Sequence, residues 1–144
     1  MVKFWDTSAV IPLTILEPST GMVRPFVDED ASIAVWWGTR VECVSAMARR
    51  QREGHISANA MRDARRVMVA LAKEWTEVTP TEALRKRAER LLAVHAIRAA
   101  DAFQLAAALV WARDDPAGNS FVCLDDRLRE AANREGFQIL PIAN

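Results

Sequence analysis

The chain has 144 residues, of which 51% are hydrophobic and 26% charged, which is typical of one globular domain spanning 1–144 and excludes a disordered protein. Its net charge is zero, so composition gives no support for bulk attraction to nucleic acid, although 16 of the 19 basic residues are Arg, whose planar fork fits phosphate oxygens. No apolar stretch reaches membrane-spanning length, no secretion signal opens the chain, and the two cysteines lack metal-site spacing. We therefore expect a cytoplasmic protein with no membrane partner.

The first third of the chain predicts two strands and one clear helix. Residues 2–5 form a strand-like run that stops at Asp6, and a helical or irregular segment broken by prolines and a glycine follows. Residues 32–37 predict the second strand. A helix over 40–53 comes next, with Gly54 as its C-terminal cap.

The middle of the chain continues the alternation of helices and strands. An apolar stripe predicts a helix over 58–73, with Ser57 as its N-terminal cap, and a short strand is expected at 75–78. Thr79 then predicts a helix start, because Pro80 would occupy the first helical position and Glu82 lies three residues after the cap.

The last third predicts a helix around Asp101, a strand at 121–124, a helix at 127–135 and a final strand at 137–140. Strands that alternate with helices over short connections favour an α/β fold. We expect a central, mainly parallel, twisted sheet of four to five strands flanked by helices on both faces. Sites in such sheets form at the carboxyl ends of the strands, near a topological switch point.

Three isolated acids occupy positions with two possible explanations. Asp6 and Asp125 each follow a strand, where either could cap the next helix or line a site. Glu42 lies three residues after Thr39, and this spacing fits a capping box, which is the stronger explanation for Glu42 taken alone.

Asp101 is the acid that capping does not explain, because the sequence places it in the middle of an otherwise apolar helix. Its structural alternative is an ion pair with Arg98, three residues earlier. Several ionised carboxylates can converge only where a compensating charge is present. Mg²⁺ or Mn²⁺ would supply that charge, because these cations prefer oxygen ligands, activate water and stabilise a transferring phosphoryl group.

The segments around these acids resemble those of PIN-domain proteins, and specifically of VapC-type ribonuclease toxins from toxin–antitoxin pairs. The resemblance runs nearly end to end, through Phe4–Ala9, Thr39–Glu42, Arg98–Ala106 and Phe121–Leu128. The third segment is the most specific. Cys123 departs from the family pattern, which commonly has Thr at this position.

The resemblance implies a three-layer PIN-like domain that acts as a Mg²⁺-dependent endoribonuclease, with Mn²⁺ as a possible substitute. The implied catalytic residues and metal ligands are the same four acids, Asp6, Glu42, Asp101 and Asp125. Asp6 and Asp101 would be the principal ligands, and Ser8 would help to order the pocket. Asp126 competes with Asp125 for its role. The resemblance also implies an RNA substrate, a homodimer, and a VapB-like antitoxin that blocks the acidic groove.

Two rival functions stay open on the sequence alone. One is a metal-dependent nuclease that acts on DNA or in housekeeping RNA processing, and the other is a catalytically silent PIN-like binding module. A haloacid-dehalogenase-like phosphatase is excluded, because Ser8 stands where that chemistry needs a second Asp.

Several other residues have ordinary structural explanations. His55 and His95 are too few and too far apart for a metal set, and surface or helix-end positions are expected. Trp36 and Trp37 are expected to pack in the core, although one could face a partner. The arginines that end the 40–53 helix, namely Arg49, Arg50 and Arg52, could equally stabilise the helix end or hold RNA phosphates.

Overall fold

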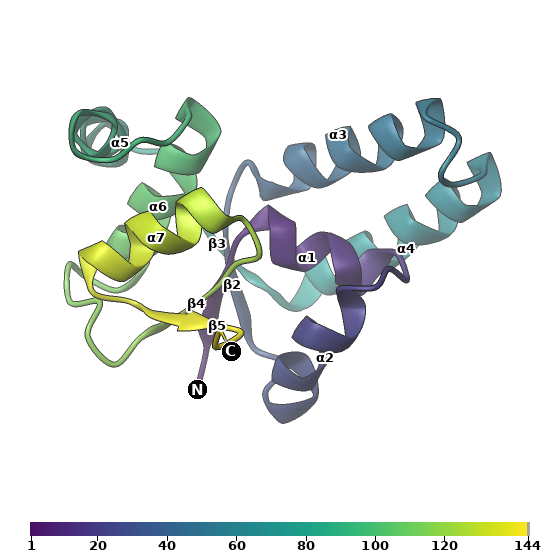
Figure 1. Cartoon of the computed structure of the whole chain (residues 1–144), viewed down its shortest axis with the longest axis horizontal. Helices are drawn as coiled ribbons and strands as arrows, with labels where there is room; N and C mark the ends of the chain where they lie inside the picture. The colour runs from purple at the N-terminus through teal and green to yellow at the C-terminus, as the bar shows by residue number, and fades with distance from the viewer. Residues whose placement is uncertain (144) are drawn as a thin grey trace.

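The computed structural model describes residues 1–143 and contains one five-stranded sheet with helices on both faces (Figure 1). The strands are β1 (Lys3–Trp5), β2 (Ile33–Trp36), β3 (Thr76–Val78), β4 (Ser120–Val122) and β5 (Gln138–Leu140). The helices are α1 (Thr7–Thr14), α2 (Thr20–Glu29), α3 (Thr39–Arg52), α4 (Ala58–Glu74), α5 (Glu82–Val94), α6 (Ala99–Trp111) and α7 (Asp126–Glu135). All four strand pairings are parallel, which confirms the predicted α/β class.

The two faces of the sheet bury two separate apolar cores, because successive side chains of a strand point to opposite faces. Phe4 packs in the core covered by α5, α6 and α7, whereas its neighbour Trp5 packs in the core covered by α1 to α4. The helices of the two cores lie on opposite sides of the strands in Figure 1. Continuous apolar runs in the short strands follow from burial on both faces.

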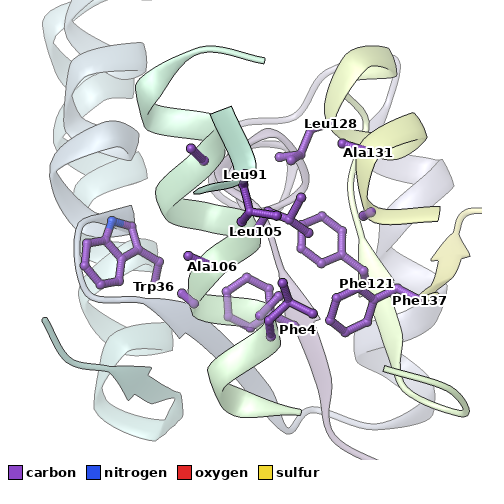
Figure 2. Close-up of a cluster of buried hydrophobic side chains, with 14 of the residues drawn as sticks. Phe4, Trp36, Leu91, Leu105, Ala106, Phe121, Leu128, Ala131 and Phe137 are labelled. Carbon is purple, nitrogen blue, oxygen red and sulfur yellow. The ribbon is translucent and has the colours of Figure 1, made fainter. Parts of the chain in front are cut away.

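The core on the α6 side is built from aromatic rings and small residues (Figure 2). Phe121 lies between Phe4 and Phe137, with ring centroids 5.5 and 5.6 Å apart respectively. Leu105 of α6 is fully buried in the same cluster, among buried alanines of its helix that let α6 approach the sheet closely. Burying each large apolar side chain contributes about 1.5 to 3 kcal/mol.

The predicted helix ends are confirmed where the cap chemistry is strong. Gly54 follows α3 in the left-handed conformation (φ 79°), and its N–H donates to the carbonyl of Gln51 at 3.1 Å. The N–H of His55 donates to the carbonyl of Arg50 at 2.8 Å, which completes a Schellman turn. Ser57 caps α4 by accepting a hydrogen bond from the N–H of Ala60 at 3.0 Å.

Two predictions about helix boundaries were wrong. Thr81, not Thr79, caps α5, because Thr81 is extended and its Oγ1 accepts from the N–H of Leu84 at 3.1 Å. The proline- and glycine-containing segment is broken at Pro18, between α1 and α2, but not at the other predicted positions, because Pro12 lies inside α1 and Gly21 inside α2. The hydroxyl of Thr20 donates to the carbonyl of Pro12 at 2.7 Å and so satisfies an acceptor near the end of α1.

The strand order β3-β2-β1-β4-β5 places a topological switch point between β1 and β4. The chain continues from β1 toward β2 and β3 on one side, and β4 and β5 lie on the other. Asp6 comes directly after β1, and Asp125 follows β4 after two residues. Both acids therefore stand at the edge of the sheet where sites form in this fold class. Among the helices described, no single one is both long and apolar enough to cross a membrane.

Candidate active site

A cavity of about 700 Å³ opens at the carboxyl ends of β1 and β4. Five acids line it. Glu17 is paired with Arg50, and each of the other four comes from a different part of the fold: Asp6, Glu42, Asp101 and Asp125. The structure thus brings together all four acids that the sequence singled out, at the switch point of the sheet. Asp126, the competitor of Asp125, is not part of the cavity lining.

Asp6 caps α1 and is held from one side. The backbone N–H and the hydroxyl of Ser8 donate to Asp6 Oδ2 at 3.1 and 2.5 Å, and Cys123 Sγ lies 3.6 Å from the same oxygen. Burial raises the pKa of the Asp6 carboxyl despite these hydrogen bonds, and the charge of Asp101 raises it further. Asp6 therefore both caps α1 and lines the cavity.

Ser8 connects the two strand ends that flank the switch point. Its Oγ donates to Asp6 beyond β1 and accepts from the N–H of Leu124 beyond β4 at 2.9 Å. The ordering role predicted for Ser8 corresponds to these contacts. Cys123 is fully buried between the same two segments, and burial raises the pKa of its thiol, so it contacts Asp6 as a neutral thiol.

Glu42 does not form the capping box that its spacing from Thr39 suggests. Its Oε1 accepts from the hydroxyl of Thr7 at 3.2 Å, and its Oε2 accepts from Gln104 Nε2 at 3.2 Å. The helix begins one residue earlier than a Thr39 cap requires, with Gly38 as the cap, so Glu42 turns into the cavity. Burial, followed by the charge of Asp6, raises the pKa of Glu42 to about 7.

Gln104 is a functional residue that the sequence interpretation missed. It is 1% exposed, and its Nε2 also lies 3.1 Å from Thr7 Oγ1 and 3.0 Å from Thr39 Oγ1. This amide therefore connects α6 to the starts of α1 and α3. A signal was present, because Gln104 is a polar residue three positions after Asp101 on the same face of an apolar helix.

Asp101 lies in the first turn of α6, so its predicted mid-helix position was wrong. The helix begins at Ala99, and Asp101 Oδ2 accepts from the backbone N–H of Arg98 at 3.3 Å. Within residues 1–143 no ion pair within 4.0 Å joins the guanidinium of Arg98 to this carboxylate, although the charge of Arg98 lowers the pKa of Asp101. The structural role of Asp101 is therefore a contact to the Arg98 backbone at the start of α6. Burial, and then the charge of Asp125, raise the pKa of the half-buried Asp101 carboxyl.

Asp125 forms the exposed rim of the cavity. It caps α7, because its Oδ1 accepts from the N–H of Leu128 at 3.0 Å, and its side chain also lines the cavity. Asp126 is the first residue of α7 and is exposed. The structure therefore places Asp125, rather than its neighbour, beside the other three acids.

The free oxygens of these acids suit a hard cation that keeps some of its waters. The hydrogen bonds of Asp6 and Asp101 use Oδ2, and Oδ1 of each accepts no hydrogen bond within residues 1–143. In the described part of the chain, no three Asp, Glu, His or Cys side chains lie close enough to form a complete ligand set. Two anchored carboxylates with one open oxygen each fit Mg²⁺, which binds few carboxylates and retains waters.

One wall of the cavity is basic and comes from the second half of α3. Arg49 and Arg50 both line the cavity. Arg50 Nε donates to Glu17 Oε1 at 2.6 Å and so fastens α3 to the connection between α1 and α2. Arg49 is exposed at the cavity edge. The two arginines therefore differ, because Arg50 has a structural partner and Arg49 faces solvent.

The two histidines lie away from the acids, as the sequence suggested. His95 follows α5 and is buried, with its Nε2 2.7 Å from Glu135 Oε2. His55 is exposed, 3.6 Å from Glu53. Neither lines the acidic cavity.

Comparison with protein-family models found no match to this chain, and comparison with curated proteins found none either.

Proposed function

We propose that the protein is a Mg²⁺-dependent endoribonuclease that hydrolyses RNA phosphodiesters in the acidic cavity. The observation that carries the proposal is the meeting of four acids from four elements at the switch point between β1 and β4. Raised pKa values of Asp6, Glu42 and Asp101 support it, because these carboxyls are protonated more readily than usual unless a cation compensates their charge.

The cation would be held by Asp6 and Asp101, with Glu42 and Asp125 completing the site directly or through water. When bound, Mg²⁺ or Mn²⁺ would activate a water molecule and stabilise the charge on the phosphoryl oxygens. The protein's own contribution is orientation. Ser8 fixes the carboxylate of Asp6, and Gln104 with Thr7 fixes that of Glu42, so these acids need little rearrangement during the reaction.

The exposed arginine at the cavity edge favours an anionic substrate. Arg49 at the cavity edge is placed to contact a phosphate, because the Arg fork matches phosphate oxygens. With a net charge of zero, the protein depends on such local contacts rather than on bulk attraction. Specificity would come from RNA shape and exposed loops.

The resemblance of the sequence motifs extends the proposal to a biological role. The protein would act in the cytoplasm as the toxin of a VapBC-type pair, as a homodimer, with a VapB-like antitoxin that blocks the acidic cavity. Expression without that antitoxin should then arrest growth, and co-expression of the gene beside it should relieve the arrest.

The test of the enzymatic proposal is cleavage of total RNA by the purified protein in Mg²⁺, Mn²⁺ or EDTA. Wild type should cleave at specific sites in Mg²⁺ or Mn²⁺ and not in EDTA, whereas Asp6→Asn and Asp101→Asn should be inactive. Asp126→Asn is the matched control, because it neutralises an acid outside the cavity and should stay active.

Three results would contradict this proposal in distinguishable ways. Cleavage that survives EDTA and both substitutions would exclude the acidic site. Preferential cleavage of DNA of the same sequence would indicate a DNA nuclease. Absence of both cleavage and calorimetric Mg²⁺ binding, in protein that is folded by circular dichroism, would indicate a silent binding module.

A further inference from the structure

A second cavity, of about 650 Å³, adjoins the acidic one and is lined mainly by apolar side chains. Val41 and Glu42 of α3 line both cavities, so the two are adjacent. Trp37 lines the second cavity with 53% of its surface exposed, whereas the preceding Trp36 is 7% exposed. Trp37 is the most exposed tryptophan of the described residues, and the acidic chemistry gives it no role.

The ring of Trp37 sits on a rigid support. Trp36 stacks on Phe103 of α6 with ring centroids 5.4 Å apart and planes 2° apart, and Trp37 contacts Trp36 edge to face at 6.4 Å and 71°. The backbone N–H of Trp37 donates to the carbonyl of Val78 at the end of β3, at 3.0 Å. Gly38 lets the chain turn closely over the indole, since a Cβ there would lie 2.5 Å from Trp36 Nε1.

Three cavities lie in a row along α3, and the side chains that line them differ from one end of the helix to the other. The aromatic cavity lies at the start of the helix, the acidic cavity lies beside its middle, and a third cavity of about 580 Å³ lies at its end. The third shares Arg49 and Arg50 with the acidic cavity. Fourteen helical residues span about 21 Å, so the aromatic cavity, the acidic cavity and the exposed Arg49 lie along α3 on a track of about that length.

We infer that Trp37 is a stacking platform for an unpaired nucleobase, next to the phosphodiester bound at the acidic cavity. This inference rests on the proposed function and narrows its substrate to single-stranded RNA. Proteins bind unpaired bases by stacking them on exposed aromatic rings, which a base inside a duplex cannot use. The lining that the aromatic cavity shares with the acidic cavity, and the exposed Arg49 at the far edge of the acidic cavity, where its guanidinium suits a phosphate, favour a nucleic acid strand over a protein segment as the occupant of this track.

The test measures binding of a short single-stranded RNA by fluorescence anisotropy, in Mg²⁺ and in an Asp101→Asn background that should not cleave. Adding Trp37→Ala should weaken binding on the order of ten- to hundredfold. Trp37→Phe keeps a π-face and should stay close to the parent. Trp37→Leu keeps apolar volume without a π-face and should match Trp37→Ala. Val94→Ala removes an exposed apolar side chain outside the track and should have no effect.

Tryptophan emission gives a second readout of the same contact. Base stacking should quench the exposed Trp37 on RNA addition, the Trp37→Phe variant should lose this quenching, and the corresponding RNA duplex should quench little. Equal RNA affinity of the parent, Trp37→Ala and Trp37→Leu would overturn the inference, whether or not the wild type cleaves RNA.

Two further outcomes distinguish base stacking on Trp37 from a protein interface at this cavity and from the catalytic proposal. If Trp37→Ala leaves RNA binding unchanged but converts a dimer to a monomer in sedimentation, the cavity is a protein interface and the inference fails. If wild type cleaves no RNA while binding depends on an aromatic ring at position 37, the catalytic proposal fails and the stacking platform stands.

Discussion

Gln104 Nε2 lies 3.2 Å from Glu42 Oε2, so a neutral amide of α6 holds an acid that belongs to α3. The same nitrogen is within hydrogen-bond distance of Thr7 and Thr39. Three elements that meet at the strand ends are thus fixed to one another by one buried side chain. The position of Glu42 in the cavity depends on this contact rather than on α3 alone.

Replacing Gln104 with Leu should therefore cost both stability and activity. The hydroxyl of the fully buried Thr39 and an oxygen of Glu42 lose a donor, and each unsatisfied buried group costs about 1 to 3 kcal/mol. We expect the free energy of unfolding to fall by roughly that amount in urea denaturation, and RNA cleavage to fall more than stability explains. Gln51→Leu, at an exposed position of α3, is the matched control. A Gln104→Leu variant with wild-type stability and cleavage would show that the amide does not position Glu42.

Ser8→Ala should disturb the orientation of the Asp6 carboxylate with little effect on folding. Ser8 Oγ donates to Asp6 Oδ2 and accepts from the N–H of Leu124, whereas the backbone N–H of residue 8 can still donate to the capping carboxylate of Asp6 in the variant. We expect Tm to fall slightly, and Mg²⁺-dependent cleavage to fall about 10- to 100-fold, the usual effect of losing an outer-shell partner of a metal ligand. Ser45→Ala changes another serine of the same cavity, on the exposed side of α3, and should cleave normally. Equal losses in both variants would argue against a specific role for Ser8.

The metal-free protein should lose stability as pH rises toward neutrality. The pKa of Glu42 is about 7 in the folded protein against an ordinary 4.5, so the folded state binds this proton more tightly than the unfolded state does. The resulting stabilisation is complete below pH 4.5 and is lost as pH rises through 7. Asp6 and Asp101 also have raised pKa values and act in the same direction.

Glu42→Gln measures this effect directly. In EDTA at pH 8 the variant should melt about 2 to 5 °C above wild type, because it lacks a partly buried charge that solvent screens only in part. The difference should vanish at pH 4, and Mg²⁺ at pH 8 should stabilise wild type more than the variant. Parallel Tm curves for the two proteins between pH 4 and 8 would contradict the raised pKa of Glu42.

Strand ends made half of the candidate site predictable from sequence. Asp6 and Asp125 follow short apolar runs, and parallel strands bring their carboxyl ends to one edge, so the period-2 pattern and the fold class placed both acids. The helix signals were equally informative where a cap is unambiguous, as at Gly54 and Ser57. Strand ends and helix caps depend on a few neighbouring residues, so the local sequence determines them.

The rest of the site depends on tertiary contacts that local patterns do not encode. Thr39 and Glu42 have the spacing of a capping box, but Gln104, 62 positions after Glu42, supplies a competing donor from another helix. The sequence placed Asp101 in the middle of a helix because the apolar run begins before it, whereas α6 begins only at Ala99. A one-turn error in a helix start changed the physical explanation for Asp101 without changing its place in the cavity.

Substitution of Arg50 should lower the stability of the protein, whereas substitution of Arg49 should weaken RNA binding. Arg50 is engaged by Glu17 at 2.6 Å, so Arg50→Ala should lower the free energy of unfolding by up to about 1 kcal/mol. Arg49 is exposed at the cavity edge, so Arg49→Ala should leave stability unchanged and weaken RNA binding. The slope of log affinity against log salt should become shallower by about 0.7, the value for one phosphate contact on a single strand. An unchanged salt slope for Arg49→Ala would remove this residue from the RNA-binding surface.

Asp125→Asn and Asp126→Asn test which of two adjacent acids belongs to the site. Asn is as good a helix cap as Asp, so Asp125→Asn should keep the contact to the N–H of Leu128 and the start of α7 intact. It removes a charge from the cavity rim, and both Mg²⁺ affinity in calorimetry and RNA cleavage should fall about 10-fold or more. Asp126→Asn removes the same charge one residue later, outside the cavity, and should retain both. The reverse order would show that α7 turns Asp126 toward the cation when Mg²⁺ binds. The adjacent pair therefore compares the same substitution, with the same loss of charge, at one position inside the cavity lining and one outside it.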